Sequence, residues 1–240
     1  MNNKKVKVEI WTDVMCPFCY IGKRKFEAGL AKFAHKDEVE VIWKSFQLDP
    51  ELKNDGTLNL TAYMARRKSV SLEEAATMSE GATQKAAMVG LHYNLDKVIP
   101  SNTLKAHQLA HFAKKHGLQS QAEELLFRSY FIDGQDIDKD ATLLQLVEEL
   151  GLSTETFKGA LDRQTYVPDV KADIAEAKAL GIRMIPHFLV NRQYVISGSY
   201  DSQTFTDMLT KAYNEEQQSP IPINIEFTQG DSCDLDGNCD

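Results

Sequence analysis

The spacing of hydrophobic positions changes from one part of the chain to the next. Apolar and polar residues alternate over Val6–Trp11 and again over Val39–Phe46, a pattern typical of half-buried strands. Between them, from Pro17 to about His35, apolar residues recur at helical spacing. The start of the chain therefore predicts a strand–helix–strand unit whose crossover should be right-handed.

A different pattern extends from about Leu58 to Leu161, where amphipathic helices succeed one another. Several of these helices begin at Ser, Asn or Asp and stop at Gly, as capping chemistry predicts. This stretch therefore predicts one all-helical subdomain. Its helical segments are 71–90, 101–117, 121–134, 140–151 and 153–163.

The last part of the chain returns to the first pattern. It predicts a helix that ends at Gly181, two short strands and a closing amphipathic helix. The complete pattern indicates an α/β fold, a mixed sheet with helices on both faces, interrupted by an all-helical insertion. The predicted parts are a sheet domain (1–57 and 163–216), the insertion (58–162) and a Pro-rich, polar C-terminal tail (217–240), which is expected to lie on the surface.

The amino-acid composition argues against several classes of function. An apolar fraction of 42% is ample for a buried core, and a net charge of −8 without a Lys/Arg cluster argues against nucleic acid as the main partner. No apolar stretch approaches the length of a membrane span, and the first residues lack the apolar run of a secretory signal. We therefore expect a cytoplasmic protein, in which a structural disulfide framework is not expected because thiols are kept reduced.

Two nearby cysteines, Cys16 and Cys19 in the stretch MCPFC, are the strongest chemical signal. A pair at this spacing serves either a metal site or a redox couple. Cys16 follows the first predicted strand and Pro17 suits the first turn of the next helix, so the helix N-terminus should stabilise a thiolate at Cys16. Cys19, one turn further in and expected to be less exposed, would then resolve the mixed disulfide formed at Cys16.

Pro186 is the second feature. It stands directly before a predicted strand, which favours a cis bond to Ile185 and an exposed backbone edge at Ile185 for a substrate peptide. Phe18 is a candidate for lining the peptide groove. His107, in the insertion, is a candidate for a position near the cysteines, where its positive charge would favour a thiolate. Asp13 is expected to cap the first helix.

The strand followed by DVMCPFCYIGK, the insertion with SNTLKAH and the late stretch GIRMIPHFLVNRQYVISGS occur in this order. Together they resemble the DsbA-like thioredoxin-fold oxidoreductases, specifically the FrnE-like subgroup, from about Val6 to Tyr213. The resemblance implies a thioredoxin-like fold and thiol-disulfide exchange, with Cys16 as nucleophile, Cys19 as resolving cysteine and Pro186 as the cis-proline of the substrate site. Two features depart from the exported DsbA proteins: the chain lacks their signal, and the dipeptide between the cysteines is Pro-Phe instead of Pro-His.

Such an enzyme needs no metal or organic cofactor, because the cysteine pair itself holds the two electrons. The expected partners are disulfide- or dithiol-containing proteins or small molecules. Glutathione, as a co-substrate, or a thioredoxin-type protein would recycle the pair.

Two other functions stay open. Glutathione-dependent isomerases of the 2-hydroxychromene-2-carboxylate type and kappa-type transferases resemble this layout, but they generally carry a serine where Cys16 stands. A four-cysteine zinc site made of Cys16, Cys19, Cys233 and Cys239 would need the tail to fold back, and the five residues between the last two exceed the usual spacing of about two to four. Without zinc, the tail cysteines form either a second redox pair that exchanges electrons with Cys16 and Cys19 or a pair of inert exposed thiols.

Overall fold

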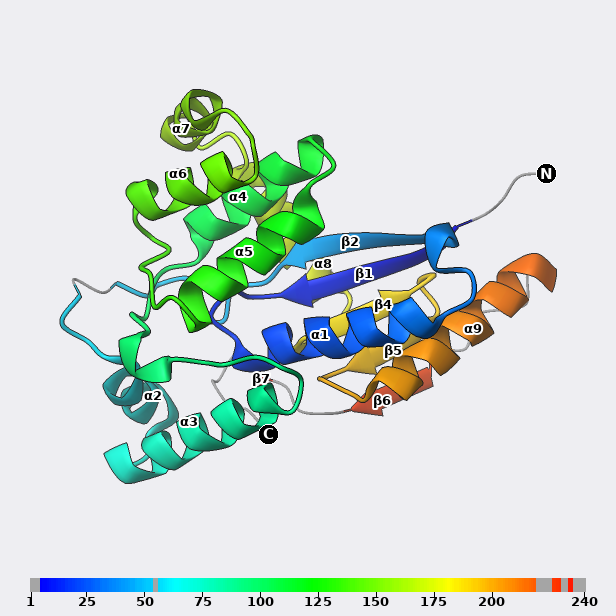
Figure 1. Cartoon of the computed structure of the whole chain (residues 1–240), viewed down its shortest axis with the longest axis horizontal. Coiled ribbons are helices and arrows are strands. Elements are labelled where there is room, and N and C mark those ends of the chain that lie inside the picture. The colour runs from blue at the N-terminus through cyan, green and yellow to red at the C-terminus, as the bar shows by residue number, and fades with distance from the viewer. Residues whose placement is uncertain (1–4, 54–55, 219–225, 230–232, 235–240) are drawn as a thin grey trace.

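A five-stranded mixed sheet forms the centre of the protein (Figure 1). The structure is a computed structural model that describes residues 5–53, 56–218, 226–229 and 233–234. The strand order is β2-β1-β4-β5-β6. β1 runs parallel to β2 and antiparallel to β4, and β5 runs antiparallel to β4 and parallel to β6. The strands are β1 (Val6–Thr12), β2 (Val39–Ser45), β4 (His187–Val190), β5 (Tyr194–Ser197) and β6 (Glu226–Gln229).

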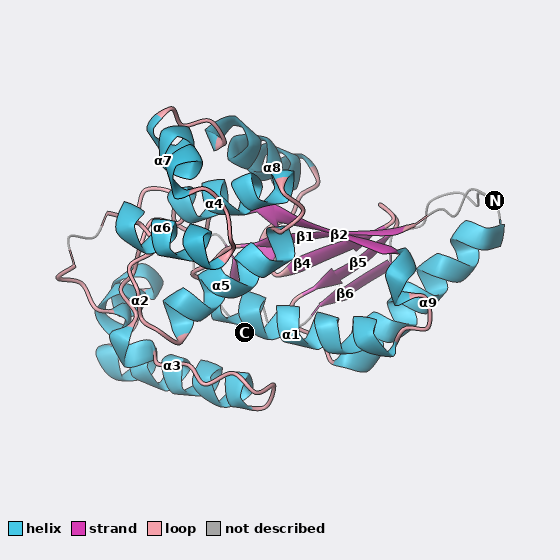
Figure 2. Ribbon diagram, turned by 45° about the horizontal axis from the view of Figure 1, so that its top comes forward, coloured by secondary structure: helices cyan, strands magenta, loops and turns pink. Residues whose placement is uncertain are grey.

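Helices cover both faces of this sheet (Figure 2). α1 (Pro17–Lys32) and α9 (Ser202–Gln218) pack together on one face, and α8 (Val167–Ala179) lies on the other. Gly29 permits the close approach of α1 and α9, because a Cβ there would lie 2.5 Å from the Ser202 carbonyl oxygen. On the opposite face, Asp173 of α8 accepts the backbone N–H of Ser45 at 3.0 Å. The predicted mixed sheet covered by helices is thus confirmed.

The helical insertion lies at one end of the sheet, where β1 and β2 finish (Figure 1). The predicted helices are confirmed, and one further helix, α2, precedes them. Its Asn59 cap accepts the N–H of Ala62 at 2.8 Å. The sequence pattern missed α2 because the helix is short and its last turn is entirely basic. The insertion consists of α2 (Leu60–Lys68), α3 (Leu72–Ala87), α4 (Leu104–Lys115), α5 (Gln119–Phe131), α6 (Asp140–Glu149) and α7 (Thr154–Asp162).

Among the described residues, the C-terminal tail contributes two strands, which the sequence pattern did not predict. β6 extends the main sheet beside β5. β7 (Cys233–Asp234) pairs antiparallel with the short strand β3 (Met184–Ile185). The residues before and within β6 alternate apolar and polar, as Ile223, Ile225 and Phe227 show, but the neighbouring prolines obscured this pattern. Cys239 lies outside the described residues.

Candidate active site

The first helix begins directly at the cysteine pair. Cys16 is the N-cap residue of α1 and has an extended backbone, and Pro17 stands in the first turn. The Cys16 amide donates to the Asp13 carbonyl at 3.0 Å, and the Cys19 amide donates to the Cys16 carbonyl at 3.1 Å. Cys16 therefore lies at the positive end of the α1 dipole, which favours an anion.

Asp13 does not cap α1, contrary to the sequence-based expectation, since no side chain makes a capping hydrogen bond at this helix start. Its Oδ2 instead accepts the backbone N–H of Leu48 at 2.7 Å, which fastens the loop after β1 to the chain after β2. The Asp13 carboxylate points into the interior because the backbone N–H of Leu48 is a buried donor there. The first-turn amides of α1 thus face Cys16 without a competing side-chain acceptor from the described residues.

Cys16 and Cys19 are free thiols, and the exposed fraction of each is 0%. The expected difference in exposure was wrong, because both side chains belong to the core between the sheet and the insertion. Burial, followed by the side-chain hydrogen bond with Cys16, raises the pKa of Cys19 well above its ordinary value. The protonated thiol of Cys19 is therefore favoured in this structure.

Pro186 lies against the helix that carries the cysteines. The Ile185–Pro186 peptide bond is cis. A Cβ at Gly22 of α1 would lie 2.8 Å from Pro186 Cγ, so the glycine makes room for the proline ring. The Ile185 carbonyl oxygen is 3.9 Å from Cys16 Sγ, within reach of a weak S–H···O contact. Ile185, Pro186 and Cys16 thus meet at one place.

The backbone edge at Ile185 is occupied in this structure. Ile185 pairs with Cys233 and Met184 pairs with Asp234, both in antiparallel register. The expectation of an exposed edge was therefore wrong, because a segment of the tail adds itself as a strand. Residues directly opposite in an antiparallel pair have Cα atoms about 4.5–5.5 Å apart, so the backbone of Cys233 lies close to the residue that contacts Cys16.

His107 lies in the interior, with an exposed fraction of 1%. Its Nε2 donates to the Phe46 carbonyl at 2.9 Å and lies 3.4 Å from Asp13 Oδ1. Burial acts to lower the pKa of His107, but the hydrogen bond and the charge of Asp13 outweigh it, so the pKa is raised. The connection between His107 and the cysteine loop thus runs through Asp13.

Glu123 of α5 is a buried carboxyl group that sequence reasoning missed. Burial raises its pKa to about 7, against the opposing effects of His107 and Lys23. Its Oε2 has no hydrogen-bond partner among the described residues. The helical spacing could have indicated Glu123, because it falls on the same face of the helical pattern as the apolar residues Ala122 and Leu126. All three residues are buried in the structure. Glu123 therefore adds a protonatable group to the Asp13–His107 pair.

His187, the residue after the cis-proline, was also missed. It is buried, and burial lowers its pKa to about 4, so its imidazole is neutral at pH 7. Its ring contacts Trp11 edge to face at 6.1 Å. A histidine inside a predicted strand carries no distinctive sequence signal, and its neutrality depends entirely on packing.

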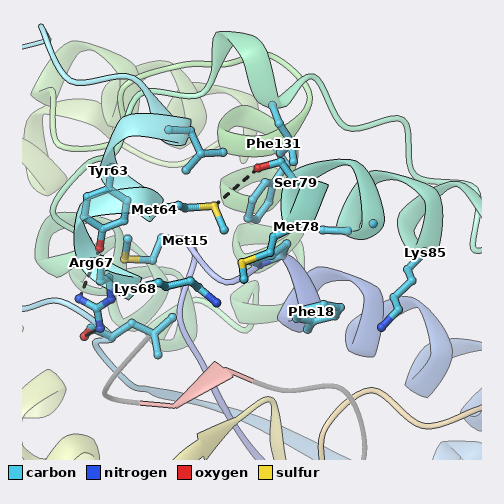
Figure 3. A pocket seen from close by; sticks show the side chains of 16 residues that line it. Met15, Phe18, Tyr63, Met64, Arg67, Lys68, Met78, Ser79, Lys85 and Phe131 are labelled. Atoms are coloured by element: carbon cyan, nitrogen blue, oxygen red, sulfur yellow. Dashed lines mark hydrogen bonds between the residues drawn. The ribbon is translucent and has the colours of Figure 1, made fainter. Parts of the chain in front are cut away.

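A cavity of about 240 Å³ opens beside the cysteine loop (Figure 3). Phe18 and Pro17 line it from α1, and most of the remaining wall comes from α2 and α3 of the insertion. The Phe18 side chain is thus placed at a pocket. Among the described residues, no cluster of three or more His, Cys, Asp or Glu side chains has the arrangement of a metal site. The zinc hypothesis includes Cys239 and so extends beyond this part of the chain.

The sheet, the cis-proline and the cysteine pair at a helix N-terminus define a thioredoxin-like protein. The model of the DSBA-like thioredoxin domain matches residues 7–210, and the chain belongs to this family. It is similar to the probable DsbA oxidoreductase SCO1869 from Streptomyces coelicolor, with 32% identity, a TM-score of 0.83 and coverage of 98% of both chains.

Two less similar structures share the fold. The cytosolic disulfide reductase DsbM from Pseudomonas aeruginosa, solved with glutathione, is 15% identical with a TM-score of 0.56 over 88% of this chain and 98% of that one. A 2-hydroxychromene-2-carboxylate isomerase is 16% identical with a TM-score of 0.60 over 88% of this chain and 96% of that one. In the described part of the chain, none of the helices combines the length and apolarity needed to cross a bilayer.

Proposed function

We propose that the protein is a thiol-disulfide oxidoreductase that uses Cys16 as nucleophile and Cys19 as resolving thiol. The observation that carries this proposal is the joint position of two free cysteines at the N-terminus of α1 with Pro186 packed against the same helix. Cys16 lies at the positive end of the α1 dipole, and burial raises the pKa of Cys19.

The proposed reaction transfers two electrons. The Cys16 thiolate attacks a substrate disulfide, forms a mixed disulfide and releases one substrate thiolate. Cys19 then loses its proton and attacks the Cys16 sulfur, which forms the Cys16–Cys19 disulfide and releases the second substrate thiolate. The reverse sequence oxidises a substrate dithiol. No cofactor takes part in either direction.

Substrate binding is proposed at Pro17, Phe18, Ile185 and Pro186. Because Cys16 is buried and β7 occupies the Ile185 edge, a peptide substrate must displace β7 before it can pair there. His107 is proposed to act at a distance, by holding the charge of Asp13 beside the cysteine loop.

Cys233 and Cys239 are proposed as a second redox pair. The register places the backbone of Cys233 opposite Ile185, next to the contact between Ile185 and Cys16. A tail disulfide could then exchange with Cys16 in the position that a substrate would occupy. Truncation after Asp231 tests this role: unchanged turnover and redox potential would rule it out.

The proposed partners are proteins or small molecules with disulfides or dithiols, in a cytoplasmic setting and within the FrnE-like subgroup. Glutathione is proposed as a recycling co-substrate, which the glutathione-bound structure of DsbM supports by analogy of fold. A thioredoxin-type protein is the other proposed source of electrons.

Trapping tests the assignment of the two cysteines. Cys19→Ser should accumulate a mixed disulfide at Cys16, detected by mass spectrometry of alkylated peptides, because the resolving step is removed. Cys16→Ser is the matched control and should trap nothing at residue 19. Capture of substrate on Cys233 or Cys239 in the Cys19→Ser protein would show that the roles are misassigned.

The alternative is a glutathione-dependent isomerase, favoured by the likeness to the 2-hydroxychromene-2-carboxylate isomerase structure. The two functions differ in their need for Cys16. Isomerase activity with glutathione that survives Cys16→Ser would support the alternative, whereas loss of disulfide exchange in the same variant supports the oxidoreductase.

A further inference from the structure

A cavity of about 240 Å³ separates the chain around Cys16 from helices α2 and α3 of the insertion (Figure 3). Met15, Pro17 and Phe18 form one part of its wall, whereas the Cys16 side chain is buried outside the wall. An apolar cavity of roughly 150 Å³ stays dry and holds a benzene molecule. The cavity beside Cys16 is therefore large enough for a molecule with one or two fused aromatic rings.

The neutral and guanidinium groups of the wall already have partners within the protein. The Tyr63 hydroxyl donates to Asp49 Oδ2 at 2.9 Å, and Arg67 forms an ion pair with the same carboxylate at 2.9 Å. The Ser79 hydroxyl donates to a backbone carbonyl oxygen of its own helix at 3.0 Å. These side chains therefore gain nothing from a polar occupant.

The two lysines of the wall are engaged as well. Lys85 Nζ lies 5.2 Å from the centre of the Phe18 ring, and Lys68 has a partner elsewhere in the protein. A carboxylate or another strongly polar group that entered the cavity would thus lose its hydration without compensation from these side chains.

The rest of the wall is apolar and adaptable. Figure 3 shows Met15, Met64 and Met78 around the same space, and Phe131 adds an aromatic ring to the wall. Methionine side chains are unbranched and polarizable, so they adjust to differently shaped apolar groups. The chemistry of the wall therefore favours an uncharged, apolar occupant.

The same wall is connected to the access of reagents to Cys16. The exposed fraction of Cys16 is 0%, so a reagent cannot reach its sulfur until the neighbouring residues move. Met15 and Pro17, the chain neighbours of Cys16, both border the cavity and can shift into its volume while the cavity is empty. An occupant fills this volume, and close packing around it resists such a shift.

We propose that the cavity is a binding site for a small, uncharged apolar molecule of one or two fused aromatic rings, and that its occupant holds the chain around Cys16 in the buried conformation. The inference goes beyond the proposed function, because it concerns binding and access and is independent of the reaction that Cys16 carries out.

Calorimetric titration of the full-length protein tests the binding site. The probe is naphthalene, and 2-naphthoate adds one carboxylate to the same ring system. Naphthalene should bind at least about tenfold more tightly, which corresponds to about 1.4 kcal/mol, because burial of the carboxylate is uncompensated. Binding of 2-naphthoate that is as tight as that of naphthalene, or tighter, would overturn the proposed ligand class.

A variant of the wall locates the bound probe. Ala82→Leu places a larger side chain in the wall from α3 and should weaken naphthalene binding about tenfold. Ala87→Leu, at an exposed position of the same helix outside the wall, is the matched control and should leave the affinity unchanged. Equal affinities in wild type and Ala82→Leu would show that naphthalene binds elsewhere and would overturn the site.

Alkylation of Cys16 tests the effect on access. Pre-reduced full-length protein reacts with iodoacetamide, and the Cys16 adduct is quantified over time by mass spectrometry of peptides. The rate should be halved when naphthalene occupies half of the cavities, because only the unoccupied molecules uncover Cys16. Ala82→Leu should need about tenfold more naphthalene for the same effect. A rate that naphthalene leaves unchanged or raises would overturn the effect on access.

These measurements fail independently of the proposed function, because neither of them requires disulfide exchange. If naphthalene does not bind while the protein still reduces disulfides, the cavity inference fails and the proposed function stands. If naphthalene binds and slows alkylation while no disulfide is reduced, the proposed function fails instead.

Discussion

Glu123→Gln should make the free energy of unfolding less sensitive to rising pH. Burial raises the pKa of the Glu123 carboxyl from its ordinary 4.5 to about 7 in the folded protein. Between these two values the unfolded chain ionises Glu123 while the folded chain keeps its proton. Because the folded state then binds more protons, the free energy of unfolding falls as the pH rises through this window and levels off above about pH 7. Glutamine remains neutral and abolishes this contribution.

The size of the effect follows from the shift in pKa. A change from 4.5 to about 7 corresponds to about 3 kcal/mol, because each pKa unit is worth about 1.4 kcal/mol. His107 acts in the same direction, since its raised pKa gives stability below its ordinary value that is lost as the pH rises through the higher value. Subtracting the profiles of variant and wild type cancels the part of the His107 contribution that does not depend on Glu123.

The measurement is urea unfolding from pH 4 to pH 8, followed by the fluorescence of Trp11 and Trp43, both of which are buried. The stability of Glu123→Gln relative to wild type should rise by about 3 kcal/mol between the ends of this range. Glu80→Gln, at an exposed position on α3, controls for the loss of one negative charge. Parallel profiles for wild type and Glu123→Gln would refute the assignment of a buried, protonated carboxyl group.

Three further changes test the packing. Gly29→Ala should lower the free energy of unfolding by about 1–3 kcal/mol in urea unfolding, because its Cβ would meet α9. The control Gly81→Ala, where the added Cβ meets open space, should raise it by about 0.5–1 kcal/mol. Equal effects of the two changes would contradict the close α1–α9 approach. Gly22→Ala should slow disulfide exchange in a stopped-flow assay more than Gly29→Ala does at matched stability, because its Cβ displaces Pro186. Asp173→Ala should lower the free energy of unfolding by about 3 kcal/mol in thermal or urea unfolding, because it leaves the buried Ser45 N–H without its acceptor and breaks the ion pair with Lys44. A loss below about 1 kcal/mol would show that other contacts hold α8 against the sheet.

The fold was predictable where periodicity and capping agree. α3 illustrates this, because Ser71 and Glu74 form a capping box that the sequence displays and the structure contains. β1 and β2 followed from alternation alone. Prediction failed where the local signal was weak, as in α2, whose last turn is basic, and in β6, whose alternation follows several prolines. These elements form because neighbouring parts of the fold provide a surface and a backbone edge for them, and no local sequence pattern reports such partners.

The site shows the same division between local and non-local information. The position of Cys16 at the start of α1 is a local property, since a strand, a proline and a helix follow one another in sequence. The occupied Ile185 edge depends on a pairing with Cys233, far along the chain, which alternation in a polar tail could not indicate. Within the described residues, β7 pairs with β3 at two positions, and a substrate strand that pairs over a greater length is expected to displace it. In the proposed function, substrate access is governed by competition between the tail and the substrate for one backbone edge, whereas the proposed nucleophile is a residue of the cysteine loop itself.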